Sequence, residues 1–387
     1  MIEEGLAKAL VPNPELYKRV DGRVEPAWMP VFYNPEARLQ RDITVAVLRT
    51  FFVDGGFEFV DLLAGTGIRS VRMALEAGGT GIANDVDPRA YRLIARNVEL
   101  NGLGPAIIPM NHDAVELSRL LLFSGFVPDY VDVDPYGSPL PFLEAAMSSL
   151  GRRALIGITA TDVASLACLA AGGALRKYAL LACGRSDFER EVGLRSLLAT
   201  IAIRAASLDR AARPLISFGH RHYYRAFVLL ERGAESAAEG LRRCVGYAWF
   251  CGTTLERGFV ESSDVFEEGA PRCADGTRSE LIGPIWICEM ADAAFVKSVL
   301  EDAASLPFIA RGALKLLGVL ARETGINAPY YRLDKLCSRL GINMPRLEEL
   351  LERLRSMGYS SARTHFDGRG FRTDAPHDEV VKALRGL

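Results

Sequence analysis

The chain has 387 residues, of which 49% are hydrophobic and 24% are charged, and its formal net charge at pH 7 is −2. This composition is typical of a globular protein, and the length predicts two or three domains. The near-zero net charge excludes a uniformly positive surface, so a nucleic acid would have to be bound by local basic patches. The apolar run 154–175 contains Thr159, Thr161 and Asp162, which favours a buried strand and helix over a membrane span.

The N-terminal half alternates apolar runs with helical segments, which predicts an α/β fold with a parallel sheet. Strands are expected at residues 57–63, 81–85, 107–111, 130–133 and 154–158. A helix is expected to follow the turn at residues 64–70 and to run to about residue 77, and another is expected at residues 88–101. Acidic residues or glycines stand at the ends of these strands. An open α/β sheet binds its ligand at this edge, so we expect the functional site there.

A glycine-rich turn follows the first of these strands. Gly65 and Gly67 let the backbone approach a ligand closely at the N-terminus of the next helix. Asp85 ends the second strand 20 residues beyond Gly65, which is the spacing of a carboxylate that binds ribose hydroxyl groups. Asp113 and the backbone N–H of Ala114 follow the third strand, where they are placed to bind an adenine edge.

The same turn distinguishes two classes of nucleotide ligand. A dinucleotide oxidoreductase shares the Gly-x-Gly pattern, but Ser70 stands where its third glycine would be. Asp61 before the turn and Arg69 within it can bind the ammonium and the carboxylate of an amino acid. This combination favours S-adenosylmethionine over NAD as the cofactor.

Asp134, Pro135 and Tyr136 directly follow the fourth strand. A carboxylate that accepts a hydrogen bond from the exocyclic amine of a base lets the nitrogen pyramidalise and expose its lone pair. Tyr136 can stack on the face of that base. The motif therefore predicts methylation of a nucleobase amine. The alternative is a turn in which Asp134 caps the helix that starts near Pro139 and Tyr136 only packs.

The motifs of the chain resemble those of the tRNA guanine-26 N2-dimethyltransferases. The matching segments are residues 32–35, 40–42, 61–70, 84–88, 134–139, 159–162, 176–178, 191–195 and 283–286. The resemblance covers nearly the whole chain, and the short length is similar to that of archaeal members. It implies a class I S-adenosylmethionine-dependent methyltransferase fold, Rossmann-like with a seven-stranded sheet, and S-adenosyl-L-methionine as the cofactor.

The resemblance also implies roles for individual residues. The residues implied to bind the methyl donor are Arg41, Gly65, Arg69, Asp85, Asp113 and Ala114. Asp134 is implied to orient and activate the guanine amine, and Phe32, Pro135 and Tyr136 are implied to enclose the base. The structural alternatives are a surface ion pair for Arg41 and a core position for Phe32.

The polar segment 231–239 predicts a domain boundary. We expect an N-terminal methyltransferase domain over residues 1–235, with an extension at 1–50, and a smaller α+β C-terminal domain over residues 236–387. Helical patterns from residue 308 onward, followed by a hairpin near residues 359–373, have the order of a winged helix, which predicts a tRNA-binding domain. The alternative is a packing or dimerisation domain of the same shape.

Two sets of arginines are candidates for contacts with RNA phosphates. The first is Arg204, Arg210, Arg213, Arg221 and Arg225, and the second is Arg346, Arg353, Arg355, Arg363, Arg369 and Arg372. For the first set the alternative is a charged helix face followed by an ordinary β-hairpin.

The seven cysteines, an odd number without a secretory signal, favour a reducing cytoplasm over a disulfide framework. Cys244, Cys251, Cys273 and Cys288 lack the paired spacing of a zinc site, so no metal is expected.

These observations predict an enzyme that methylates the N2 amine of guanine 26 in tRNA, giving N2-methyl- and N2,N2-dimethylguanosine. The alternative function is a non-catalytic RNA-binding protein on a methyltransferase fold. Cytosine C5 methylation is disfavoured because that chemistry needs a cysteine near the base, and the Asp134 motif contains none. We expect a cytoplasmic monomer that binds tRNA and neither DNA nor a membrane.

Overall fold

The computed structural model describes residues 1–53 and 55–387. The chain forms two compact units, and each is assembled from three separate segments. Unit 1 comprises residues 1–159, 227–232 and 297–317, and unit 2 comprises residues 160–226, 233–296 and 318–387.

The first part of the chain contains six strands before residue 150, and they are joined mainly by helices. The strands are β1 (Ile2–Glu4), β2 (Ala7–Ala9), β3 (Phe57–Asp61), β4 (Gly79–Asn84), β5 (Ile107–Met110) and β6 (Tyr130–Val133). The α-helices are α1 (Arg38–Phe51), α2 (Ile68–Ala77), α3 (Pro88–Leu100), α4 (Ala114–Ser124) and α5 (Leu140–Ser148). Three short 3-10 helices, η1 (Pro14–Tyr17), η2 (Pro26–Trp28) and η3 (Pro35–Ala37), precede α1.

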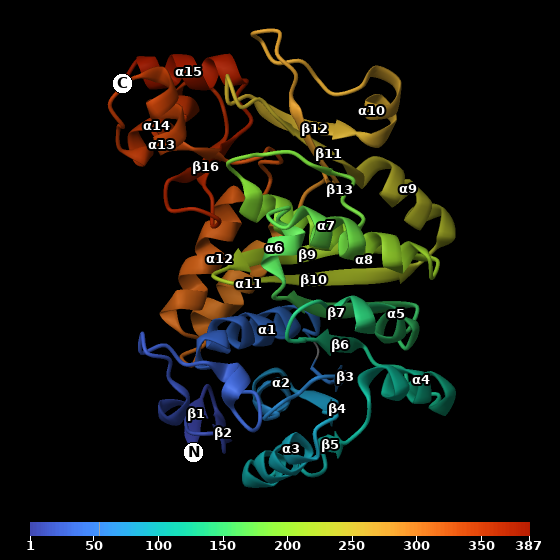
Figure 1. The fold of residues 1–387 in the computed structure, drawn as a ribbon. Helices are drawn as coiled ribbons and strands as arrows, with labels where there is room; N and C mark the ends of the chain where they lie inside the picture. Colours follow the sequence, from blue (N-terminus) through green and yellow to red (C-terminus); the bar gives the residue numbers. More distant parts are fainter. Residues whose placement is uncertain (54) are drawn as a thin grey trace. The chain divides into compact units, whose positions relative to one another are not determined.

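A seven-stranded sheet has the strand order β5-β4-β3-β6-β7-β10-β9 (Figure 1). The pairs β4/β5, β3/β4, β3/β6 and β6/β7 are all parallel, and β7 covers Arg153–Ala160. The chain builds outward from β3 through β4 to β5 and then returns to β6 on the other side of β3. The order therefore reverses between β3 and β6, and ligands of open α/β sheets bind at such a switch point. The seven-stranded Rossmann-like sheet expected from the sequence is confirmed.

Local sequence explains how the helices next to this edge begin and end. Gly67 and Gly78 flank α2 in the left-handed conformation, which glycine adopts without steric cost. Asp87 caps α3 by accepting a hydrogen bond from the Arg89 N–H, and Pro88 occupies the first turn, where a missing N–H costs nothing. These caps fix the points at which the chain leaves the sheet edge.

The strands β1 and β2 form an antiparallel hairpin that is tied to α1 and α2 through buried charges. Glu4 is 3% exposed and accepts hydrogen bonds from Arg41 at 2.6 and 2.7 Å and from Arg72 at 2.9 Å. Arg72 also forms ion pairs with Asp42 at 2.7 Å and Glu76 at 2.8 Å. Because each buried charge has a partner of opposite sign, the network can stabilise the packing of the N-terminal segment on α1 and α2.

The rest of the chain supplies the remaining elements. The helices are α6 (Val163–Leu166), α7 (Ala171–Tyr178), α8 (Glu189–Ala206), α9 (Ala234–Cys244), α10 (Ser262–Glu268), α11 (Ala293–Ser305), α12 (Arg311–Glu323), α13 (Leu333–Leu340), α14 (Leu347–Ser356) and α15 (His377–Arg385). The strands are β8 (Ala182–Cys183), β9 (Arg210–His220), β10 (Tyr223–Arg232), β11 (Val245–Phe250), β12 (Arg257–Glu261), β13 (Glu280–Trp286), β14 (Tyr331–Arg332), β15 (Ser361–Arg363) and β16 (Gly370–Thr373).

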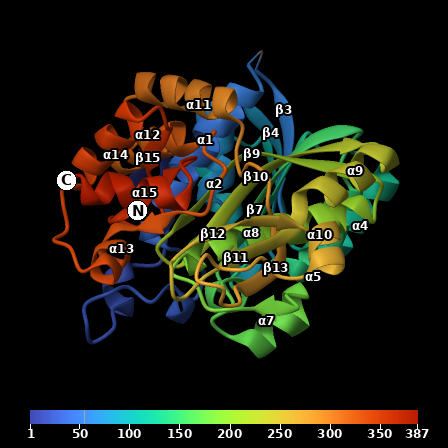
Figure 2. The ribbon, with the colours of Figure 1, turned by 90° about the horizontal axis from the view of Figure 1, so that it is seen from above.

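Unit 2 contains two further sheets. The four-stranded sheet has the order β12-β11-β13-β8, and the three-stranded sheet has the order β14-β16-β15. The helices α13, α14 and α15 gather around the smaller sheet (Figure 2). Leu336, Leu350, Leu354, Phe371 and Val380 form part of its hydrophobic core. The helices α12, α13 and α14 precede the β15–β16 hairpin, which is the order of three helices and a hairpin that the sequence predicted.

Several arginines that the sequence analysis predicted to contact RNA phosphates are buried. Arg210 is 4% exposed and Arg225 is fully buried, and both lie on strands of the β9–β10 hairpin rather than on a helix face. Arg372 is 1% exposed and donates hydrogen bonds to Glu191 at 2.8 Å and Glu323 at 3.0 Å. The prediction of phosphate contacts is wrong for these three side chains, because a buried guanidinium cannot reach a bound RNA backbone.

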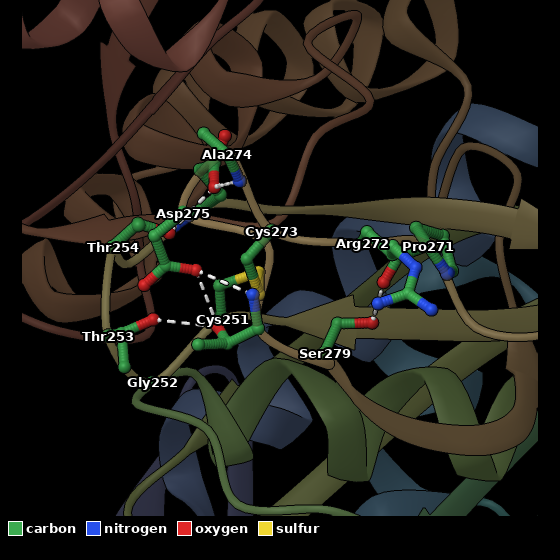
Figure 3. The surroundings of a disulfide bond; sticks show 12 residues. Cys251, Gly252, Thr253, Thr254, Pro271, Arg272, Cys273, Ala274, Asp275 and Ser279 are labelled. Carbon is green, nitrogen blue, oxygen red and sulfur yellow. Dashed lines mark hydrogen bonds between the residues drawn. A yellow bond between two sulfur atoms is a disulfide. The ribbon is translucent and has the colours of Figure 1, made fainter.

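The cysteines also correct the sequence analysis. Six of the seven form disulfides, namely Cys168–Cys183, Cys244–Cys288 and Cys251–Cys273, and Cys337 is free and buried. Figure 3 shows the Cys251–Cys273 bond, which joins the segment after β11 to the loop before β13. The partners are 15, 44 and 22 residues apart in sequence, so neither the count nor the spacing revealed them. A disulfide framework is therefore present in unit 2, contrary to the prediction.

The apolar run 154–175 forms β7, α6 and the first part of α7, as the strand-and-helix prediction required. No helix within the described residues is both long enough and apolar enough to cross a bilayer.

Candidate active site

The glycine-rich turn lies at the edge of unit 1 where β3 ends. Gly65 and Gly67 have φ angles of 56° and 73°, a region that other residues rarely adopt. A Cβ atom at Gly65 would lie 3.0 Å from the backbone oxygen of Phe32, which is closer than ordinary packing allows. The turn therefore needs glycine for its conformation and for the close approach of the segment that carries Phe32.

Asp85 is positioned next to this turn by two backbone groups. Its carboxylate accepts hydrogen bonds from the Gly65 N–H and the Asp87 N–H, each at 2.9 Å. Burial raises the pKa of the Asp85 carboxyl above its usual value, and the two N–H groups partly oppose that rise. The side chain is half-buried at the carboxyl end of β4, the position expected for a carboxylate that binds ribose.

Asp113 and Ala114 stand at the start of α4. The Asp113 side chain is exposed and caps the helix by accepting hydrogen bonds from the Val115 N–H at 2.9 Å and the Glu116 N–H at 3.1 Å. Ala114 is buried. The two residues lie in the connection from β5 to α4, so they stand one strand further along the same sheet edge than Asp85.

Three aspartates and one arginine form a cluster at the switch point, which we call the donor cluster: Asp61, Asp132, Asp134 and Arg69. Asp61 and Asp132 are register partners on the parallel strands β3 and β6 and are 1% and 0% exposed. The Arg69 guanidinium donates a hydrogen bond to Asp134, and its Nε lies 3.5 Å from Asp132 Oδ1. The remaining guanidinium nitrogen, Nη1, donates to the Thr44 hydroxyl at 3.3 Å.

The carboxylates of the donor cluster have different surroundings. The Ser70 hydroxyl donates a hydrogen bond to Asp61 Oδ2 at 2.8 Å, and the Tyr130 hydroxyl donates to Asp132. Asp61 Oδ1 is buried and has no hydrogen-bond partner within the described residues. Burial, followed by the neighbouring Asp132 charge, raises the pKa of Asp61 to about 7, although Arg69 and Ser70 oppose the rise.

Asp134 and Tyr136 do not have the structural roles that were the alternative for this motif. The N-terminal cap position of α5 is Pro139, and the Leu140 N–H donates to the Ser138 hydroxyl at 3.5 Å rather than to Asp134. Tyr136 is 76% exposed and Phe32 is 45% exposed, so neither belongs to the core. Their ring centroids lie 6.2 Å apart in an edge-to-face arrangement. Pro135 between Asp134 and Tyr136 is buried, which anchors the segment that carries them.

Arg41 is buried and not part of a surface ion pair. It is paired with both carboxylate oxygens of Glu4 and lies over the ring of Tyr33, with the guanidinium carbon 5.6 Å from the ring centroid. It also donates to the backbone oxygen of Asn34 at 3.3 Å, two residues beyond Phe32. The contact with a methyl donor that the resemblance implies for Arg41 stays a prediction.

Asp132 and Tyr130 are the members of this site that the sequence analysis did not single out. Both lie inside a strand that was recognised from its apolar residues. The available signal was an acid inside a buried strand, since such a residue is rarely buried without a partner.

Within the described residues, no group of three or more His, Cys, Asp or Glu side chains is placed to hold a metal ion.

Known proteins that are similar to this chain belong to one family. The family model for N2,N2-dimethylguanosine tRNA methyltransferase matches residues 12–385. A tRNA (guanine(26)-N(2))-dimethyltransferase from Aeropyrum pernix is 36% identical over 98% of this chain and 95% of its own length. One from Methanopyrus kandleri is 38% identical over 92% of this chain and 90% of its own length.

A solved structure resembles the whole chain. Trm1 from Pyrococcus horikoshii in complex with S-adenosyl-L-methionine superposes with a TM-score of 0.83 and 32% identity, covering 99% of this chain and 98% of that one. The chain belongs to the N2,N2-dimethylguanosine tRNA methyltransferase family.

Proposed function

We propose that the protein transfers methyl groups from S-adenosyl-L-methionine to the exocyclic N2 amine of guanine 26 in tRNA, giving N2-methyl- and N2,N2-dimethylguanosine. The observation that carries the proposal is the placement of Asp134, which is bonded to Arg69 and is followed two residues later by the exposed ring of Tyr136. Membership of the family supports the choice of substrate and reaction.

The residues at the switch point fit the cofactor. The Asp61 carboxylate has a buried oxygen without a partner, which an ammonium group can satisfy, and Arg69 can bind a carboxylate. The turn at Gly65 and Gly67 gives close backbone access, and the Asp85 carboxylate is already oriented by two N–H groups to accept from ribose hydroxyls. When bound, S-adenosyl-L-methionine supplies an electrophilic methyl group.

Asp134 activates the attacking amine by accepting a hydrogen bond from one of its N–H groups. This bond favours a pyramidal nitrogen whose lone pair is no longer delocalised into the ring, and the carboxylate can take the proton as the new N–C bond forms. Arg69 donates a hydrogen bond to Asp134 and so holds its carboxylate in one orientation. Tyr136 and Phe32 bind the guanine face, since aromatic rings stack on a base that has left its helix.

The second methyl transfer uses the same groups. The monomethylated amine keeps one N–H, which is enough for the hydrogen bond to Asp134. A carboxylate that acted only by neutralising positive charge would not orient the monomethylated amine for the second transfer.

We further propose that the residues of 236–387 hold the tRNA, and that Arg346 and Arg353 supply phosphate contacts. Arg346 is the N-cap of α14 and Arg353 lies within it, and both are exposed. Within the described residues neither forms a salt bridge, whereas the half-buried Arg363 is paired with Glu348. An unpaired arginine can bind a phosphate without first breaking an ion pair.

The enzyme is proposed to be a cytoplasmic monomer that binds tRNA and not DNA. The test of function is mass analysis of nucleosides after the full chain is incubated with S-adenosyl-L-methionine and unmodified tRNA. The expected products are N2-methyl- and N2,N2-dimethylguanosine, both lost when guanine 26 is replaced by adenine. Donor binding without any methylated guanosine would favour a non-catalytic RNA-binding protein.

The double variant Arg346→Ala/Arg353→Ala tests the proposed contacts of these two arginines with tRNA phosphates. It should weaken tRNA binding and lower the slope of log affinity against log salt by roughly 1–2, as loss of two phosphate contacts requires. The matched control is Arg363→Ala, which should leave the slope unchanged. Equal effects of both changes would contradict the assignment.

A further inference from the structure

The donor cluster contains more negative than positive charge. Asp61, Asp132 and Asp134 offer three carboxylates, and Arg69 is the one guanidinium that the described structure places among them. Asp61 and Asp132 are adjacent through their strand register and are almost fully buried. Two buried carboxylates side by side do not both ionise readily, because each charge disfavours the other and neither is solvated.

The groups that face Asp61 identify it as the carboxyl that holds a proton. Asp132 accepts a hydrogen bond from the Tyr130 hydroxyl and lies beside the Arg69 guanidinium, which also donates a hydrogen bond to Asp134. In the part of the chain that the structure describes, Asp61 Oδ2 accepts a hydrogen bond from Ser70, and Asp61 Oδ1 is buried without a hydrogen-bond partner. These groups from β6 and α2 leave Asp61 as the least stabilised anion of the cluster.

We propose, on the basis of the function above, that Asp61 is protonated while the donor site is empty and releases that proton when S-adenosylmethionine binds. The O–H bond of the Asp61 carboxyl breaks, the proton passes to the solvent, and the resulting carboxylate pairs with the ammonium of the donor. The donor carries an ammonium, a sulfonium and one carboxylate, so its entry adds a net positive charge to a cluster that has more carboxylates than guanidinium groups.

The proposal gives donor binding a defined pH dependence. Because burial and Asp132 raise the pKa of Asp61 to about 7, the proton must be removed on binding at pH 6 but is largely absent at pH 8. The contribution of Asp61 should therefore raise donor affinity about fivefold between pH 6 and pH 7 and little above pH 8.

Calorimetric titration of the full chain with S-adenosylmethionine measures the proton directly. At pH 6.5 the free α-amino group of the donor is already protonated, since such groups titrate near about 7.7–8.0. Titrations in buffers of different ionisation enthalpy should show that wild-type protein releases at least roughly half a proton more per donor than Asp61→Asn. At pH 8.5 the two proteins should exchange equal numbers of protons.

A second variant, which keeps Asp61, tests proton release even if the Asp61→Asn protein does not fold. Ser70→Ala removes the hydroxyl that stabilises the Asp61 anion, so proton release should persist to higher pH than in the wild type. Equal proton exchange by wild type and Asp61→Asn at pH 6.5, or an unshifted profile for Ser70→Ala, would overturn the inference. The absence of any donor binding by the wild type would instead contradict the proposed function.

Discussion

Two buried ionic clusters in this protein differ in charge balance. The donor cluster of unit 1 has three carboxylates around Arg69. The second cluster, in unit 2, consists of Glu191, Arg195, Glu323, His365 and Arg372. There two carboxylates meet two guanidinium groups and an imidazole, with Arg195 bonded to Glu191 at 2.8 Å and Arg372 bonded to both glutamates.

The pKa shifts of the carboxyl groups in the two clusters go in opposite directions. Burial disfavours ionisation of Glu323, but His365 and Arg372 outweigh it and lower the pKa to about 2. Burial also opposes ionisation of Glu191, yet Arg372 and Arg195 lower its pKa. For Asp61 burial and Asp132 prevail and raise the pKa to about 7. The comparison teaches that a balanced buried cluster can stabilise a fold, whereas an unbalanced one is suited to bind a cation.

The largest effect should follow from removing Asp134. Asp134→Ala is expected to lower turnover by a factor of about 10²–10⁴, as loss of a positioned base does, while donor affinity changes little. Single-turnover methylation of tRNA and calorimetry with S-adenosylmethionine measure the two quantities. Turnover within a few-fold of the wild type would remove Asp134 from the mechanism.

In the balanced cluster the corresponding change should affect stability instead. Arg372→Met leaves Glu191 and Glu323 without their shared partner, so we expect a loss of roughly 3–5 kcal/mol in the free energy of unfolding. Denaturant unfolding measures this loss, with Arg363→Met as a solvent-accessible control that should cost less than about 1 kcal/mol. Unchanged stability would mean that the cluster does not support unit 2.

The two clusters should also respond to pH in opposite ways. The folded-state pKa of Glu323 lies below its usual 4.5, so the stability it contributes is present above pH 4.5 and is lost as pH falls toward 2. The folded-state pKa of Asp61 lies above its usual 3.8, so its contribution is favourable at low pH and is lost as pH rises toward 7.

The variant that isolates the second effect is Asp61→Asn. At pH 8 its free energy of unfolding, measured with denaturant, should exceed that of the donor-free wild type by on the order of 1–3 kcal/mol. This difference should shrink at pH 5. A difference that does not change between pH 5 and pH 8 would contradict the assignment of the buried proton.

The smallest effects should come from the aromatic pair. Tyr136→Phe is expected to be nearly silent because the ring face is kept, whereas Tyr136→Ala should lose roughly 1–3 kcal/mol of base stacking. The measurement is kcat/KM for unmodified tRNA, with donor affinity as the control. Equal losses in the two variants would show that the hydroxyl group, rather than the ring, is needed.

The sequence by itself determined the elements that depend on local pattern. The strands β3 to β7, the turn at Gly65 and the winged-helix order could be predicted, because apolar periodicity and turn residues report conformation directly. Asp134 and Tyr136 were recognisable since their residue types at a strand end suit one chemistry. For Phe32 the sequence left a core position open, and the structure shows an exposed ring beside Tyr136.

Only the tertiary structure decided which distant side chains meet. The adjacency of Asp61 and Asp132 depends on the register of two strands that are separated by more than one βα unit along the chain. The pairing of Arg41 with Glu4, the burial of Arg372 and the three disulfides likewise depend on contacts between segments far apart in sequence. Charge balance is set by all the groups around a site, so a sequence read one segment at a time does not reveal it.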